Sequence, residues 1–292
     1  MRTTTIAAFL AVASLAAHAA EPRSFTDHRS LNGDAKLSVR NLAGVIEIEA
    51  WDKAEFDLAA LLGDSAERIE ISGTAADLKV EVKNRKSHSS YGDGDTRLKL
   101  RVPAGASLSL DGTSSDIVVR GSKGVLTARS VSGDIDLSVG SRVITVQTVS
   151  GDLRLEAPAA KEARLNTVSG DVDVKGASGL LVAESVSGDV EVEGGTFTQL
   201  DLKSVSGDIG VQAGFAAEAK VKAESLSGDV RVNAPASLSA EVTMKTFSGD
   251  KHSGFDAARD ASDGKRMVLK IGEGRGQLTL TSFSGDVTLD KQ

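Results

Sequence analysis

The chain has 292 residues, enough for one large or two ordinary domains, and a formal net charge of −7. This acidic balance argues against a nucleic-acid partner, which would need a basic stripe. Only 3% of the residues are aromatic, whereas glycine contributes 30 residues, so we expect a core of small aliphatic and β-branched side chains in thin stacked layers. The chain has no cysteine, which excludes disulfides and a lipid-bearing N-terminal cysteine.

Residues 1–19 have the pattern of an export signal. Arg2 supplies a positive charge, a short apolar run extends from Ile6 to Ala16, and Ala17-His18-Ala19 fits the small-x-small cleavage rule. The apolar run is too short to cross a bilayer as a helix, and no other stretch approaches that length. We therefore expect a signal peptide at 1–19 and a mature chain without a transmembrane segment. Its expected location is periplasmic or secreted, and it is not a lipoprotein.

Residues 20–105 alternate apolar and polar side chains without a fixed repeat. Val45-Ile46-Glu47-Ile48-Glu49 and Leu98-Lys99-Leu100-Arg101-Val102 have the alternation of half-buried strands. The segment from Asn84 to Thr96 contains almost nothing apolar and predicts a surface loop. Irregular β-structure is typical of the capping end of a repeat protein. We therefore interpret residues 20–105 as an irregular β region that caps a regular stack.

Residues 106–292 repeat the motif Val-Ser-Gly-Asp. The Ser-Gly-Asp triplet occurs eight times, with its glycine at Gly133, Gly151, Gly170, Gly188, Gly207, Gly228, Gly249 and Gly285. Successive copies are 18, 19, 18, 19, 21, 21 and 36 residues apart. The last interval contains the polar segment 251–266, which we interpret as an insertion. A period sustained over this length indicates a repeat protein.

Each copy contains two short strands around the motif. With the serine before the glycine as position zero, apolar residues occupy minus six and minus four, as in Ile144 and Val146, and plus three and plus five, as in Leu153 and Leu155. This alternation points one face inward and one outward. Position minus two is Ser or Thr in every copy, and we expect these hydroxyls to hydrogen-bond along the stack. Position minus one is Val, Leu or Phe, which breaks the alternation and indicates a bend.

We interpret the motif as a corner. Its glycine takes the positive φ or the close neighbour contact that a corner requires, and its aspartate is expected to accept hydrogen bonds from the amides of its own turn. Two strands and one corner in about 18–21 residues predict an all-β fold, a single-chain parallel β-solenoid with one coil per repeat. The alternative is an antiparallel β-sandwich of repeated hairpins. A sandwich does not require identical corners in register, whereas a solenoid does.

The sequence resembles the bacterial envelope proteins catalogued as putative adhesins, the DUF4097 family. The resemblance covers nearly all of the chain after the export signal. It rests on the repeated Val-Ser-Gly-Asp, on Val45-Ile46-Glu47-Ile48 with Trp51-Asp52, on Leu98 to Pro103, and on Gly272-Glu273-Gly274-Arg275-Gly276 before the last copy. It implies an extended β-solenoid-like domain with an adhesin-like role, and it supplies no catalytic residues.

Two kinds of chemistry are candidates for the aspartate of the corner. A stacked column could bridge calcium with turn carbonyls, although the Gly-Gly-x-Gly-x-Asp nonapeptides of calcium-binding β-rolls are absent from the sequence. A polysaccharide-acting β-helix enzyme would need paired carboxylates in unlike environments, which a uniform column does not supply. The column consists of Asp134, Asp152, Asp171, Asp189, Asp208, Asp229 and Asp250.

We therefore expect an exported, non-catalytic protein with a structural or binding role in the cell envelope. No residue is assigned a catalytic, cofactor-binding or metal-binding role, and the isolated histidines His28, His88 and His252 are assigned no chemistry. The expected partner is an envelope protein or a glycan. Because the outward residue at position minus three varies from copy to copy and carries no uniform charge, the non-repetitive loops at 84–96 and 251–266 are predicted partner sites in preference to the corners.

Overall fold

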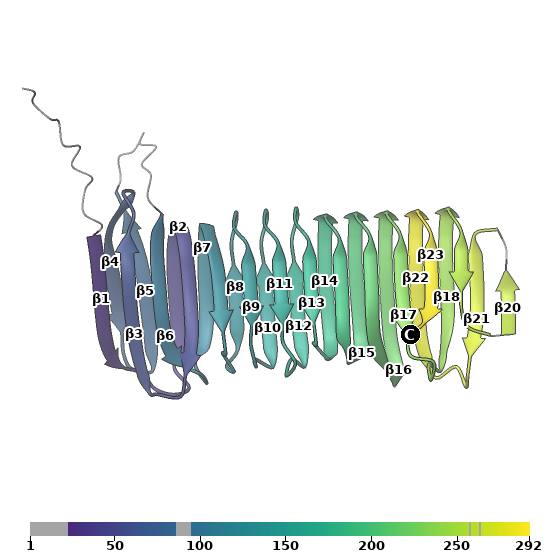
Figure 1. Ribbon diagram of the computed structural model, residues 1–292, viewed down its shortest axis with the longest axis horizontal. Helices are drawn as coiled ribbons and strands as arrows, with labels where there is room; N and C mark the ends of the chain where they lie inside the picture. The colour runs from purple at the N-terminus through teal and green to yellow at the C-terminus, as the bar shows by residue number, and fades with distance from the viewer. Residues whose placement is uncertain (1–22, 86–94, 257, 263) are drawn as a thin grey trace, which may run out of the picture.

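The computed structural model describes residues 23–85, 95–256, 258–262 and 264–292. These residues form 23 strands, which Figure 1 shows stacked side by side along one rod. None of the described segments is a helix of the length and hydropathy needed to cross a membrane. The predicted signal peptide, residues 1–19, and residues 86–94 of the predicted loop lie outside the described residues.

The middle of the rod, residues 107–234, is a stack of coils in chain order. Each strand pairs in parallel with the equivalent strand one repeat away: β9 with β11 and β11 with β13, and likewise β8 with β10 and β10 with β12. The strands of this region are β7 (Ser107–Arg120), β8 (Leu126–Arg129), β9 (Ile135–Ser138), β10 (Val143–Gln147), β11 (Leu153–Glu156), β12 (Glu162–Asn166), β13 (Val172–Lys175), β14 (Gly179–Ser187), β15 (Val190–Ser206), β16 (Ile209–Ser227) and β17 (Val230–Ala234).

The register of these strands follows the repeat. Ile135 lies opposite Leu153, and Leu153 lies opposite Val172, so equivalent residues of successive copies are paired. The prediction of an all-β, β-solenoid-like fold is thereby confirmed. The alternative, an antiparallel sandwich of repeated hairpins, is not supported, because the repeated strands pair in parallel.

The core is the line of inward side chains that the alternation predicted. Ile144 and Val146 before the corner, and Leu153 and Leu155 after it, are all no more than 2% exposed. The core consists mainly of such aliphatic side chains, stacked one coil on the next. Each coil buries its apolar surface on its neighbours, which explains how a chain with so few aromatic residues forms a continuous core.

The N-terminal end departs from chain order. β2 pairs in parallel with β7 on one side, and on the other side with β5 through its first half and with β6 through its second half. The coil formed by β2 therefore lies between two coils that follow it in the sequence, and it pairs across the predicted boundary at residue 105. Antiparallel strands cover the outer side, β4 on β5, β3 on β6, and β1 on β3. The strands here are β1 (Arg23–Ser30), β2 (Lys36–Trp51), β3 (Glu55–Leu62), β4 (Ala66–Gly73), β5 (Asp77–Asn84) and β6 (Thr96–Pro103).

The C-terminal end departs from chain order in the same way. β22 pairs in parallel with β16 and with β18, and β23 pairs in parallel with β17 and with β19. The last coil of the chain is thus inserted between two earlier ones, as Figure 1 shows for the yellow strands. β21 then covers β18, and β20 covers β21, both antiparallel. The strands are β18 (Ala240–Ser248), β19 (Lys251–Ser253), β20 (Ala258–Ser262), β21 (Arg266–Ile271), β22 (Gly276–Ser284) and β23 (Val287–Lys291).

Candidate binding surface

The glycine of each corner sits against the main chain of the neighbouring coil. At Gly188 the φ angle is 151°, which L-residues with a side chain rarely adopt. A Cβ at Gly188 would lie 2.1 Å from the carbonyl oxygen of Gly170. On the opposite side, the Gly188 N–H donates a hydrogen bond to the carbonyl oxygen of Ser206 at 3.1 Å. Both predicted reasons for the glycine, positive φ and close contact, are confirmed at Gly188, whereas Gly207 shows the close contact without the positive φ.

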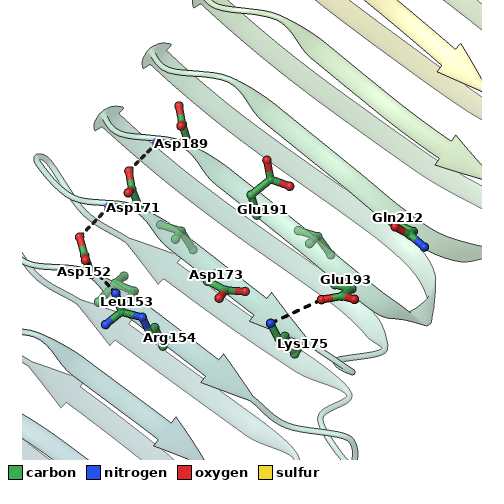
Figure 2. Close-up of a pocket in the computed structure, with 12 residues that line it drawn as sticks. Asp152, Leu153, Arg154, Asp171, Asp173, Lys175, Asp189, Glu191, Glu193 and Gln212 are labelled. Carbon is green, nitrogen blue, oxygen red and sulfur yellow. Dashed lines mark hydrogen bonds and ion pairs between the residues drawn. The ribbon is translucent and has the colours of Figure 1, made fainter.

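The aspartates of the corners form a ladder between coils. Asp171 Oδ1 accepts a hydrogen bond from the N–H of Asp189 at 2.9 Å, and Asp189 Oδ1 accepts one from the N–H of Asp208 at 2.7 Å. Figure 2 shows part of this ladder, from Asp152 to Asp189. In stacking order the same bond recurs along the ladder, from Asp116 at one end through Asp229 and Asp286 to Asp250 at the other. The prediction that each aspartate caps its own turn is wrong, because its carboxylate reaches the amide of the next coil, one strand spacing away.

The hydroxyl at position minus two also bonds between coils. Ser185 Oγ donates to the carbonyl oxygen of Gly170 at 3.1 Å, and Ser204 Oγ donates to that of Gly188 at 3.1 Å. The predicted hydrogen bonding along the stack is therefore confirmed, with the corner carbonyl as acceptor. Thr148 is an exception, because its buried Oγ1 has no hydrogen-bond partner among the described residues. Together the glycine, aspartate and hydroxyl hold neighbouring corners at a constant spacing.

The outward side chains that follow the corner include a dense group of acids. Asp173, Asp189, Glu191 and Glu193 border a shallow hollow of about 500 Å³ that also adjoins Lys175. Figure 2 shows these carboxylates on one face, with Lys175 paired to Glu193 at 3.5 Å. The hollow is open to solvent on the surface of the sheet, so it suits a large partner better than an enclosed small molecule.

Two carboxylates of this face have opposite pKa shifts. Glu191 extends over Gly210, where an added Cβ would lie 2.0 Å from Glu191 Oε2. Burial raises the pKa of Glu191, and the neighbouring charges of Asp189, Asp173 and Asp208 raise it further. In contrast, hydrogen bonds from Arg120 at 2.9 Å lower the pKa of Asp136. Outside the corner column, the acids of this face therefore lie in unlike environments.

The described residues offer little support for a calcium site. Among them, no group of three or more His, Cys, Asp or Glu side chains is placed to hold a metal ion. In the ladder, one oxygen of each carboxylate except that of Asp250, which ends the ladder, already accepts a main-chain N–H. Six of the seven aspartates on which the calcium hypothesis rests thus have a structural partner in the next coil.

A line of exposed apolar side chains runs along the corners. The residue at position minus one is 42–58% exposed in all eight copies. Parallel pairing of the flanking serines and threonines keeps these side chains in register. We call this line the corner ridge; in stacking order it comprises Val131, Val149, Val168, Val186, Val205, Leu226, Phe283 and Phe247.

The aromatic end of the corner ridge depends on the inserted coil. Because β22 lies between β16 and β18, Phe283 comes to lie beside Phe247. Their rings stack with centroids 4.9 Å apart and planes 2° from parallel. The ammonium of Lys265, just before β21, lies 3.9 Å from the centroid of the Phe247 ring. A cationic side chain of the protein itself therefore rests on the end of the ridge.

The sequence prediction placed the partner sites elsewhere. Most of the 84–96 loop lies outside the described residues, and the 251–266 segment contains β19, which completes a coil by pairing with β23. The apolar residue at minus one was interpreted only as a bend. The sequence nevertheless contained evidence for an exposed apolar line. A bend requires no particular side chain, whereas position minus one is Val, Leu or Phe in every copy.

Comparisons with known proteins place the chain in a family. No curated protein matches the sequence. A solved structure of a putative lipid binding protein from Parabacteroides distasonis is 15% identical, covering 92% of this chain and 96% of that chain with a TM-score of 0.46. A putative adhesin from Bacteroides fragilis is 14% identical, with 92% and 97% covered and a TM-score of 0.43. A family model described as Toastrack DUF4097 matches residues 35–290, which include every copy of the corner. The chain therefore belongs to the Toastrack DUF4097 family, as the repeated Val-Ser-Gly-Asp suggested.

Proposed function

We propose that the protein is a non-catalytic binding rod of the bacterial cell envelope, and that the corner ridge is its binding surface. The observation that carries this proposal is the exposure of the ridge, 42–58% at eight apolar side chains in one line. Single exposed apolar residues are ordinary, whereas a contiguous line of them marks an interaction site. The partner is an envelope protein or a glycan.

The construction of the corners favours binding. Each corner is tied to the next by a glycine contact, an aspartate–amide bond and, in most copies, a hydroxyl–carbonyl bond. The ridge is therefore organised before a partner arrives, and less conformational entropy is lost on association than with a mobile loop. The adhesin-like role that the family resemblance implies agrees with this arrangement.

Export is part of the proposal and rests on the sequence of residues 1–19, with its charged start, apolar run and small-x-small site. The expected location is the periplasm or the exterior. Fractionation of the native host, with mass spectrometry of the N-terminus, tests it directly. A mature protein that begins at Ala20 supports export, and an intact Met1 in the cytoplasm would refute it.

A second candidate, a polysaccharide-acting enzyme, is favoured by one observation. The pKa of Glu191 is raised by burial and by the charges of neighbouring Asp189 and Asp173, and a pair of carboxyl groups in unlike environments is the arrangement that glycoside hydrolysis uses. The hollow is open, however, and does not exclude water from a reacting bond. Release of reducing sugar from envelope polysaccharide that disappears in Glu191→Gln would favour the enzyme over the binding rod.

Site-specific photo-crosslinking in the native host tests the binding function. A photoreactive residue is placed at Val186, which is on the ridge, or at Val125, which is 51% exposed but lies outside it. We expect adducts with an envelope component from position 186 and none from position 125. Equal adduct formation at both positions, or none at either, would show that the ridge is not the binding surface.

A further inference from the structure

We propose that the partner of the corner ridge is a cationic amphipathic α-helix that lies along the rod. This inference deepens the proposed binding function and rests on it. Three observations carry it: the spacing of the ridge, the line of charge beside it, and the lysine that already covers its end.

The spacing of the ridge matches a helix. Ridge side chains are one coil apart, about 4.8 Å, and the Phe247–Phe283 separation of 4.9 Å measures this directly. One face of an α-helix repeats every turn, about 5.4 Å, whereas one face of an extended strand repeats about every 6.6 Å. A helix therefore keeps its apolar side chains near successive ridge positions for several coils, and a strand loses register sooner.

The charge beside the ridge calls for a cationic partner. The aspartate ladder begins three residues after each ridge residue and runs parallel to it. The ladder carboxylates lie at the surface: the Asp152 and Asp208 side chains are 36% and 45% exposed, although Arg154 pairs with Asp152 and Arg231 pairs with Asp208. Lysine or arginine beside the apolar stripe of a helix would lie along this acidic column. A second copy of the rod would bring two acidic columns together, and an anionic membrane would be repelled.

The protein shows the same combination within itself. The ammonium of Lys265 rests 3.9 Å from the centre of the Phe247 ring, although that ring is 58% exposed. A cation over an aromatic face is an attractive arrangement. The end of the ridge is thus already occupied as we propose for the rest of it, with a basic side chain lying over an apolar one.

The length of the ridge sets the size of the partner. Eight positions span seven coil spacings, about 34 Å at the spacing of paired strands. A helix rises about 1.5 Å per residue, so about 22 residues would cover the whole ridge. Leucine or a similar residue at i, i+3, i+4 and i+7 would supply the required apolar stripe.

Three synthetic peptides test the inference on the purified full chain. The first is a lysine–leucine peptide of about 22 residues with leucine on one helical stripe. The second replaces every lysine by glutamate, and the third has the lysine–leucine composition in strict alternation, which favours a strand. We expect the first to bind most tightly in fluorescence anisotropy, and its affinity to fall as salt increases. The glutamate peptide is expected not to bind, and the alternating peptide to bind about tenfold more weakly.

Ridge variants separate the proposed contact from general attraction to an acidic protein. The triple variant Val168→Thr, Val186→Thr and Val205→Thr should weaken binding of the lysine–leucine peptide about tenfold, because the apolar contact is reduced. The control carries Val125→Thr and Val143→Thr, two exposed valines outside the ridge, and should bind as the parent does. Unchanged melting temperatures will show that both variants fold.

Other occupants give distinct results. Equal binding of the parent and the triple ridge variant, or of the helical and alternating peptides, would overturn the inference. Self-association of the parent in sedimentation, or binding to anionic vesicles, that is lost in the triple variant would also overturn it. If position 186 crosslinks in cells but the lysine–leucine peptide does not bind, the binding function stands and the helical partner is wrong. If neither occurs, both fail.

Discussion

The middle of the rod and its two ends contain the same kind of coil but stack it by different rules. In the middle, residues 107–234, neighbours in space are neighbours in sequence. At each end one coil is stacked out of sequence order. The coil of β2 lies between β7 and the coil of β5 and β6. The coil of β22 and β23 lies between the coil of β16 and β17 and the coil of β18 and β19. The first and the last coil in the sequence are therefore not the outermost coils of the stack.

This difference protects the ends. The last coil of a simple stack has a neighbour on one side only and presents an open row of main-chain groups, which favours fraying and aggregation. Here the coils of β2 and of β22–β23 are paired on both sides, and antiparallel strands cover the outermost coils. Out-of-order insertion thus ties each end of the chain into the stack.

Removing the inserted C-terminal coil should destabilise the protein more than any other change proposed here. Truncation after Arg275 deletes β22 and β23 and separates β16–β17 from β18–β19. We expect the residues after Ser227 to unfold, with a loss of roughly 5 kcal/mol or more, comparable to the stability of a small domain. Hydrogen exchange and urea unfolding will measure it.

Deletion of a middle coil is the matched control for this truncation. Removing residues 171–188 takes out one repeat and joins Gly170 to Asp189, which restores a Ser-Gly-Asp corner. Because each coil contacts only its neighbours, we expect a shorter rod that still folds. If the middle deletion proves as damaging as the truncation, the ends have no special role.

The next effect concerns the corners of the middle. Gly188→Ala places a Cβ against the Gly170 carbonyl oxygen at 2.1 Å and requires an unfavourable φ, so we expect a loss of about 1–3 kcal/mol. In Gly210→Ala the new Cβ meets the flexible Glu191 carboxylate, and the change should stay within about 0.5 kcal/mol. Urea unfolding compares the two. Equal losses would show that main-chain contact does not determine the corner.

A smaller effect separates two corner hydroxyls. Ser185→Ala removes the bond from Oγ to the Gly170 carbonyl and should cost about 0.5–1.5 kcal/mol. Thr148→Val removes a buried Oγ1 that has no partner among the described residues, so stability should be unchanged or slightly higher. Thermal unfolding of both variants measures the difference, and a clear loss in Thr148→Val would point to a bridging water.

The smallest effect is on the pH dependence of the acidic face. The raised pKa of Glu191 means that the folded state binds its proton more tightly than the unfolded state. The contribution of Glu191 to the free energy of unfolding is therefore greatest below its unfolded-state pKa and is lost as pH rises through its folded-state pKa. Glu191→Gln should for this reason raise the stability at neutral pH and leave it unchanged in acid. Arg120 lowers the pKa of Asp136, so Asp136 stabilises the folded state above its unfolded-state pKa. This stabilisation is lost as pH falls through the folded-state pKa. Asp136→Asn should destabilise at neutral pH, and melting curves between about pH 3 and 7 will test both signs.

The structure of a single coil can be predicted from local sequence alone. The period, the inward rows such as Leu153 and Leu155, and the corner glycine all follow from local alternation and from contact between equivalent residues one repeat apart. These features need no knowledge of distant segments, because each residue meets its own counterpart in the next copy. The corner motif also carries part of the resemblance to the family whose model matches the chain.

The order of the coils at the ends and the exposure of the ridge could not be predicted from local sequence, because both depend on contacts between distant segments. The edges of all coils resemble one another, so local sequence does not specify that β22 stacks on β16 instead of following β18. The direction of the aspartate ladder depends likewise on where the next coil lies. Val186 was visible as an apolar corner residue, but its exposure depends on whether another layer covers the corner. The ridge side chains are 42–58% exposed, with Lys265 lying over Phe247 at one end, and for that reason the ridge is a surface and not a part of the core.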